Sequence, residues 1–312
     1  MALTPEQEQE IEDNRRHKQE TLRPTVVALE DVLFQAVPVL DHGFVRLIDY
    51  MGDDAAIVQA ARVSYGAGTR HVREDRGLLR YLLRHAHTTP FEMCEIKLHV
   101  KLPIFVARQW IRHRTANVNE LSARYSVLDR EFYVPAAETL ARQSQSNRQG
   151  RGEILPADQA AHVQHLLRAD SEAAHDRYEW LMSEGADDGS APAGPGLARE
   201  LARMSLSLNY YTQWYWKIDL HNLLHFLRLR MDPHAQYEIR AYGDAIAAIV
   251  ARWVPLTWEA FSDYQANGFR LSAGALDAVR RMLAGEAVDA DSCGLSRREW
   301  SELMTALGRP AD

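Results

Sequence analysis

Alternation of apolar and polar residues predicts strands in the middle of the chain. The clearest case is 93–101, where every second residue from Cys94 to Val100 is apolar and the residues between them are charged or polar. A period of two is typical of a strand with one buried face. The other segments with strand character are 43–50, 131–134 and the aromatic stretch 210–218.

Apolar residues at helical spacing predict most of the remaining elements. Leu78, Leu79, Leu82 and Leu83 recur at intervals of three and four, which places them on one helix face. The expected helices are 54–65, 78–85, 103–114, 156–183, one ending at about Leu208, 219–231 and 234–253, with loose helical segments at both ends. The pattern predicts an α+β fold: a mixed, largely antiparallel sheet packed against several helices, in a single domain with helical extensions.

Two glycine- or polar-rich segments interrupt these elements. Residues 143–152 (QSQSNRQGRG) are typical of a loop, and 185–196 contains four glycines and two prolines. Candidate functional residues lie on both sides of 185–196. We therefore interpret this segment as an insertion or crossover within one domain.

Composition narrows the class of protein. The 312 residues are 46% hydrophobic and 25% charged, which is ordinary for a globular chain and excludes a disordered or collagen-like one. Two cysteines cannot build a disulfide framework. The chain has no apolar run of about 20 residues and no apolar core of a secretory signal near its start. We expect a cytoplasmic protein that does not enter a membrane.

Charge is distributed unevenly along the chain. The net charge of −7 argues against a nucleic-acid partner bound by bulk charge. Between Arg108 and Arg124, however, four arginines face a single acid, Glu120. A local cationic patch on an acidic protein indicates a small anionic ligand.

The richest polar segment is 108–126, RQWIRHRTANVNELSARYS. Arginine presents a planar fork that binds phosphate in two hydrogen bonds. Glu120 can accept from sugar hydroxyls or ring N–H groups, and the Ser122 hydroxyl can donate and accept. A solvated basic turn is the alternative interpretation, but the density of polar groups between small residues favours a binding site.

Other catalytic motifs are absent or incomplete in the sequence. Gly66-Ala67-Gly68 lacks the third glycine of a dinucleotide fingerprint, and the chain has neither a phosphate-binding Gly-Lys-Ser/Thr loop nor a Gly-x-Ser-x-Gly elbow. Cys94 lies on the apolar face of the expected strand, where a thiol usually packs inertly. Ser122 has no histidine base beside it in sequence.

Two histidine pairs and an aromatic stretch leave alternatives open. His85 with His87, and His221 with His225, have spacings that can bind zinc, although Asn222 stands where a metalloprotease helix carries glutamate. A metal-dependent hydrolase is therefore one alternative, while we expect no bound metal. A nucleotide- or RNA-binding module that stacks bases on the aromatics of 210–216 is another.

Four motifs together resemble one family. The string Arg112-His113-Arg114-x4-Asn119-Glu120-x-Ser122-x-Arg124-Tyr125 resembles the signature of the flavin-dependent thymidylate synthases. Asn117 stands where the family pattern has serine. The segments 85–92, 103–110 and 227–239 also match, in the family's order, and the resemblance covers about 42–265.

The resemblance implies an enzyme. It implies reductive methylation of dUMP to dTMP, with 5,10-methylenetetrahydrofolate as carbon donor and NADPH reducing a bound FAD. It also implies a homotetramer whose sites are shared between subunits, with dUMP, folate and NADPH as its ligands. The expected organisation is an extension over 1–40, a catalytic domain over 41–268 and a helical extension over 269–312.

The same resemblance assigns roles residue by residue. Its dUMP-binding positions are Gln109, Arg112, Glu120, Leu121, Ser122, Ala123, Arg124, Arg203 and Arg230. Its FAD-binding positions are Thr89, Arg112, His113, Arg114, Glu120, Asp219, His221 and His225. His87 takes the folate side of the flavin, and Arg230 is the expected catalytic residue, which activates the uracil ring.

Overall fold

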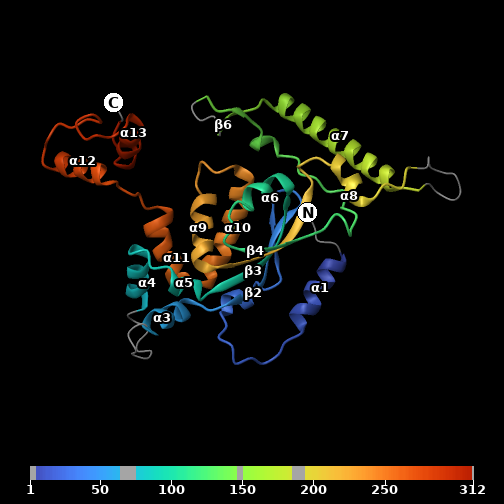
Figure 1. Ribbon diagram of the computed structural model, residues 1–312, viewed down its shortest axis with the longest axis horizontal. Helices are drawn as coiled ribbons and strands as arrows, with labels where there is room; N and C mark the ends of the chain where they lie inside the picture. The colour runs from blue at the N-terminus through green and yellow to red at the C-terminus, as the bar shows by residue number, and fades with distance from the viewer. Residues whose placement is uncertain (1–4, 64–74, 146–149, 185–193, 311–312) are drawn as a thin grey trace. The chain divides into compact units, whose positions relative to one another are not determined.

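The computed structural model describes residues 5–63, 75–145, 150–184 and 194–310 (Figure 1). The chain divides into two compact units, Met1–Glu259 and Ala260–Asp312. Gly66-Ala67-Gly68, most of 185–196 and the middle of 143–152 lie outside the described residues. The first unit holds a five-stranded sheet, a two-stranded hairpin and most of the helices.

The main sheet has the strand order β1-β2-β3-β7-β4, and every neighbouring pair is antiparallel. Its strands are β1 (Ala36–Val39), β2 (Gly43–Met51), β3 (Glu95–Pro103), β4 (Asn117–Glu120) and β7 (Tyr211–Asp219). The separate hairpin consists of β5 (Ala141–Gln143) and β6 (Arg151–Ile154). The expected largely antiparallel sheet in an α+β fold is confirmed.

One face of the sheet carries the core. Leu98 on β3 pairs with Trp216 on β7, and both side chains are buried. Three helices, α6 (Ile104–Trp110), α9 (Leu220–Arg230) and α10 (Tyr237–Trp253), pack against the sheet (Figure 1). The Trp110 ring of α6 lies edge-on to Trp216 at 5.1 Å and to Trp214 at 5.6 Å. This aromatic cluster packs around Trp110, the last residue of α6, two residues before Arg112.

The described part of the first unit contains eight other α-helices. They are α1 (Pro5–Arg16), α2 (Val27–Glu30), α3 (Asp54–Val63), α4 (Asp75–Arg84), α5 (Thr89–Glu92), α7 (Ala157–Met182), α8 (Arg199–Ala202) and α11 (Pro255–Phe261), whose last residues pass into the second unit. The 3-10 turns are η2 (Ala137–Thr139) and η3 (Arg203–Ser205). Most expected helices are confirmed, with ends shifted by a few residues.

Three local expectations were wrong. The helix expected over 103–114 ends at Trp110. Residues Asn117–Glu120 form strand β4 instead of a loop, because the open edge of β7 offers backbone partners to them. The short strand expected over 131–134 is a single bridge between Phe132 and Tyr210.

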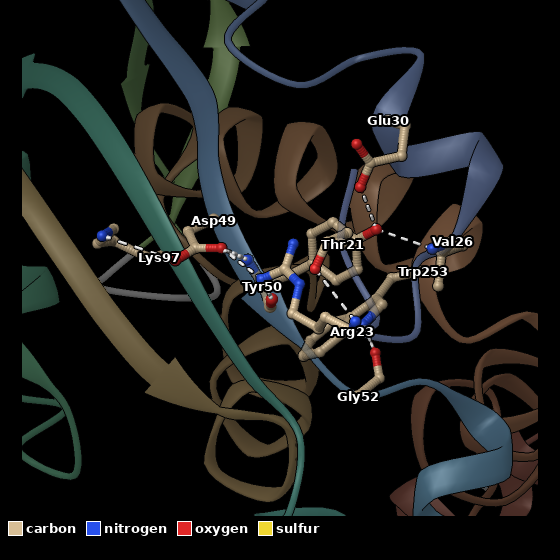
Figure 2. Close-up of polar contacts among 9 residues, drawn as sticks. All are labelled: Thr21, Arg23, Val26, Glu30, Asp49, Tyr50, Gly52, Lys97 and Trp253. Atoms are coloured by element: carbon tan, nitrogen blue, oxygen red, sulfur yellow. Dashed lines mark hydrogen bonds and ion pairs between the residues drawn. The ribbon is translucent and has the colours of Figure 1, made fainter. Parts of the chain in front are cut away.

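The segment before α2 is fastened to the end of β2 (Figure 2). Arg23 Nη1 donates to Asp49 Oδ1 at 3.0 Å and to the Tyr50 carbonyl at 2.9 Å. The Tyr50 hydroxyl accepts from the Val26 amide at 2.7 Å and donates to Glu30. These bonds tie the N-terminal residues to the sheet, whereas α1 itself buries only Ile11.

The second unit is a small helical module. Its helices are η4 (Ser262–Ala266, a π-helix), α12 (Ala273–Leu283) and α13 (Arg297–Ala306). Ala278, Leu303 and Met304 form its core, and Ser296 with Glu299 makes a capping box at the start of α13. In the described ranges of both units, no helix is at once long enough and apolar enough to cross a membrane.

Candidate functional site

The arginine-rich turn is placed by the aromatic core beneath it. Trp110 is fully buried, and its ring lies 4.8 Å from Phe226 on α9. Three residues later, the His113 ring lies 5.4 Å from Phe226 and 5.6 Å from His225. The sequence-predicted positions His113 and His225, far apart in the chain, therefore lie side by side.

Arg230, the last residue of α9, reaches the end of α6 just before this turn. Its Nη2 lies 3.5 Å from the Gln109 carbonyl, to which it donates, and its guanidinium carbon lies 6.0 Å from the Phe226 ring. The Arg230 Nε and the Gln109 Oε1 are both buried without a hydrogen-bond partner in the described chain. A buried polar atom without a hydrogen-bond partner destabilises the fold by about 1–3 kcal/mol. Binding of a ligand that forms hydrogen bonds with both atoms would therefore be favoured.

Burial sets the charge state of this cluster. The pKa of His113 is lowered by burial first and then by the neighbouring His225 and Arg230. Partial burial also lowers the pKa of His225, and its neighbours Arg228, His221 and Arg230 lower it further. Both rings are therefore held neutral near pH 7, where each can donate one hydrogen bond and accept another.

Arg112 and Arg114 flank His113 and are both exposed. Within the described part of the chain, neither guanidinium has a carboxylate in ion-pair distance, whereas Arg124 and Arg130 do. Two unpaired guanidiniums at one turn repel each other and attract an anion. They suit the pyrophosphate of a dinucleotide.

Glu120 ends β4 and is held from the neighbouring strand. The Thr212 hydroxyl of β7 donates to Glu120 Oε1 at 2.7 Å, and the next amide, Leu121, donates to the Gln213 carbonyl at 2.8 Å. Thr212 is buried while Glu120 is exposed, so the carboxylate is fixed at one oxygen and open at the other. The free oxygen can accept from a ligand.

The residues after Leu121 form a second cluster. The Arg124 amide donates to the Ser122 hydroxyl at 3.3 Å, and the Arg124 side chain pairs with Glu200 at 2.9 Å. Arg203 Nε donates to the backbone carbonyl of Glu200 at 3.3 Å. Glu200 thus brings Arg124 and Arg203 together, although 185–196 separates them in sequence. Ala123 is buried beneath them, packed with Ala202.

The start of α9 is capped by a predicted site residue. Asp219 Oδ1 accepts from the Asn222 amide at 3.0 Å and Oδ2 accepts from the Asn222 side chain at 2.7 Å. The Asn222 backbone lies beside the His113 ring and raises its pKa, which offsets part of the lowering caused by burial. Asp219 therefore acts first as the helix cap, and His221 follows it, half-buried, on the first turn.

Thr89 and His87 lie at another element. Thr89 begins α5, which packs against α9, and it is exposed there. The His87 ring lies 5.8 Å from Tyr81 and is exposed, and the His85 ring lies 4.4 Å from the same tyrosine. Thr89 and His87 can therefore reach a ligand bound outside the core.

The alternative chemistries gain little from the geometry. Cys94 is fully buried, and burial raises the pKa of its thiol to about 12, which disfavours the nucleophilic thiolate. No three His, Cys, Asp or Glu side chains of the described ranges gather in a way that could hold a metal ion. Trp214 and Trp216 are buried in the core, which leaves only Tyr215 exposed on that stretch.

The structure thus assembles two groups of predicted residues. The first contains Gln109, His113, His225 and Arg230, and the second contains Ser122, Arg124 and Arg203. Three residues that the sequence did not single out as site residues hold predicted ones in place: Thr212 bonds Glu120, Glu200 pairs with Arg124, and Asn222 bonds Asp219. Asn222 drew attention only as a departure from a zinc motif, and Thr212 carries no sequence signal, because its role depends on strand register.

An exposed arginine turn beside buried polar atoms without hydrogen-bond partners is an arrangement suited to a small anionic ligand. Residues 46–256, more than half of the chain, match the family model described as thymidylate synthase complementing protein. The chain belongs to this family, and the resemblance expected from its signature is confirmed.

Curated relatives match almost the whole chain. A flavin-dependent thymidylate synthase of Gluconobacter oxydans is 62% identical over 307 residues, 98% of this chain and 99% of the relative. Another of Ruegeria pomeroyi is 60% identical over 309 residues, 99% of this chain and 100% of the relative. Among solved structures, a UMP/dUMP methylase PolB from Streptomyces cacaoi bound with 5-Br UMP is similar with a TM-score of 0.64. That structure is 33% identical and covers 73% of this chain and 97% of its own.

Proposed function

We propose that the protein is a flavin-dependent thymidylate synthase that converts dUMP to dTMP. The observation that carries the proposal is the turn Arg112–Arg114 with Gln109 and Arg230 beside it, where the family signature coincides with orphaned buried polar atoms. The relatives of 60–62% identity support the same activity over nearly the full length.

The residues present fit a flavin dinucleotide. Arg112 and Arg114 would hold the pyrophosphate of FAD, while the neutral rings of His113 and His225 would bond its polar groups. The remaining proposed contacts to FAD are Thr89, Glu120, Asp219 and His221. When bound, the flavin supplies hydride chemistry that no side chain of the chain can supply.

The second cluster fits the nucleotide. Arg124 and Arg203 would bind the phosphate dianion of dUMP, and Ser122 with the free oxygen of Glu120 would bond the sugar or ring. The further dUMP contacts that we propose are Gln109, Arg112, Leu121, Ala123 and Arg230.

Arg230 is the proposed catalytic residue. Carbon 5 of uracil becomes a nucleophile only when negative charge builds in the ring, and a guanidinium beside the ring stabilises that charge. Packing of Phe226 and Leu227 holds α9, so the Arg230 side chain is positioned before the substrate arrives. Burial lowers the pKa of Arg230. A guanidinium pKa lies so far above 7 that the group still stays charged.

We further propose the co-substrates and assembly. They are NADPH as reductant and 5,10-methylenetetrahydrofolate as carbon donor near His87, in a cytoplasmic homotetramer with sites shared between subunits. In this proposal 41–268 is the catalytic domain, and 1–40 and 269–312 are extensions.

The test has two readouts. The purified protein should be yellow with a flavin spectrum, and it should release tritium from 5-labelled dUMP only when both methylenetetrahydrofolate and NADPH are present. A colourless protein that retards labelled RNA would support the nucleic-acid alternative instead. Tritium release that needs an added divalent metal and no flavin would contradict the proposed chemistry.

A further inference from the structure

A cavity of about 420 Å³ lies between the β5–β6 hairpin and the residues that join α9 to α10. We call it the hairpin pocket; its lining includes Arg142, Arg151, His234, Tyr237 and Arg240. Its volume is in the range of small-molecule sites, which is about 300–1,000 Å³. None of the residues assigned above to dUMP, flavin or folate lines it.

One of the three arginines is already neutralised. Arg151 pairs with Glu238, whose carboxylate is 2% exposed and also accepts from the Tyr133 hydroxyl at 3.1 Å and from Gln236 Nε2 at 2.9 Å. The Arg151 guanidinium additionally lies 5.3 Å from the Tyr237 ring. These contacts make a rigid wall and leave Glu238 little capacity to neutralise a second cation.

The other two arginines bond only neutral partners. Arg142 Nη2 donates to Gln159 Oε1 at 3.1 Å, and Arg240 Nη1 donates to the Pro233 carbonyl at 3.0 Å. In the described ranges neither arginine has a carboxylate within ion-pair distance. The charge of Arg240 acts on Asp244, one turn later in α10, and offsets part of the rise in its pKa that burial causes. Each guanidinium has five N–H donors, so most donors of both remain available to a ligand.

The backbone adds to this positive field. α10 begins at Tyr237 on the pocket wall, and its N-cap residue Gln236 makes no side-chain capping bond. The first amides of a helix have no partner within it, and the helix dipole makes this end favourable for anions. The helix end and the two arginines therefore act on the same cavity.

We propose that the hairpin pocket binds the phosphate group of a small phosphorylated molecule, with Arg142 and Arg240 as its guanidinium donors. Two forks on facing elements fit a tetrahedral dianion, and the volume leaves room for an attached group such as a nucleoside. Because Arg142 belongs to the hairpin and Arg240 to α10, a bound anion would also fasten the hairpin to the helix.

Hydrogen exchange measured by mass spectrometry locates such binding along the chain. The full-length protein with its flavin is compared with and without pyrophosphate as the probe. We expect slower amide exchange in 141–145, 150–154 and 233–240 together. The variant Arg142→Gln/Arg240→Gln should lose this protection, with binding at least about tenfold weaker. Arg168→Gln, an exposed arginine on α7 with the same charge loss, should keep it.

Two further comparisons make the outcome decisive. Arg230→Lys should retain hairpin protection, because Arg230 does not line the pocket. Protection by dUMP at lower concentration than by pyrophosphate identifies a nucleotide site, and equal protection by inorganic phosphate identifies a site for phosphate alone. No protection of the hairpin by any probe, or equal protection in the double variant, overturns the proposal. If the double variant does not fold, Arg142→Gln alone serves, because Arg142 is exposed.

Discussion

The Thr212 hydroxyl on β7 donates a 2.7 Å hydrogen bond to Glu120 Oε1 at the end of β4. Thr212 is 4% exposed, so its hydroxyl has little access to water and holds the Glu120 carboxylate from the buried side of the sheet edge. The bond exists because antiparallel pairing sets Glu120 opposite Trp214, which brings Thr212, two residues before Trp214 on β7, into reach.

Removing this hydroxyl should weaken catalysis without unfolding the protein. Thr212→Val keeps the shape of the side chain but frees Glu120, and a lost hydrogen bond to a charged group costs about 1.5–3 kcal/mol. We expect kcat/KM for dUMP to fall about tenfold or more. Thr212→Ser should restore most of the activity. Equal activity of the valine and wild-type proteins would show that Glu120 needs no support from β7.

Arg230→Lys should separate a catalytic role from a helix-capping role. Lysine keeps a cation at the end of α9, so the fold and the flavin content should not change. It lacks the planar fork, so turnover at saturating dUMP should fall about 100-fold, which corresponds to about 2.7 kcal/mol of transition-state stabilisation. Steady-state dTMP formation measures this effect. Near-normal turnover would leave Arg230 as a cap of α9.

The two residue clusters should complement each other between subunits. If one subunit supplies the Arg124–Arg203 cluster and another supplies Arg230, then co-assembly of Arg203→Ala with Arg230→Ala creates some intact sites. If equal amounts of the two variants pair at random, about a quarter of the sites contain both functional halves. Activity of isolated mixed oligomers measures this fraction.

Arg124→Ala mixed with Arg203→Ala is the matched control. Glu200 joins these two arginines within one chain, so they belong to the same half of the site. This pair should restore no activity. Complementation by the control pair, or none by Arg203→Ala with Arg230→Ala, would contradict the proposed division.

Stability should fall on mild acidification because of His99. Arg46 Nη2 donates to His99 Nδ1 at 2.9 Å, while His99 Nε2 lies 3.0 Å from Gln213 Oε1 and the ring stacks on Tyr215. Burial, and then the charge of Arg46, lowers the pKa of His99 from 6.5 to about 4. The folded protein therefore holds this ring neutral.

The sign follows from proton binding in the two states. Above pH 6.5 neither state binds the proton, and between 6.5 and about 4 only the unfolded state binds it, so the free energy of unfolding falls as pH falls. The expected loss from pH 7.5 to 5 is about 2 kcal/mol. Urea unfolding of wild type and His99→Gln measures it. The variant should show a flatter pH dependence, whereas His234→Gln, an exposed histidine, should behave like wild type.

Local sequence patterns determined much of this protein. The period of two over 93–101 predicted β3, and the spacing of leucines predicted α4, because burial of one face imposes its period on the residues. The signature around Arg112–Arg114 indicated the family, since side-chain chemistry at fixed spacing is visible without the fold.

Tertiary structure alone decided how the site is supported. Residues 117–120 are too polar for a strand pattern, and they form β4 only because β7 offers an open edge. Glu200 holds Arg124 and Arg203 from a short helix, and Thr212 reaches Glu120 through strand register. Asn222 bonds Asp219 at the start of α9, and its backbone affects the pKa of His113 from across the fold. These contacts link residues far apart in sequence, so their physical cause is the packing of whole elements, which no local pattern records.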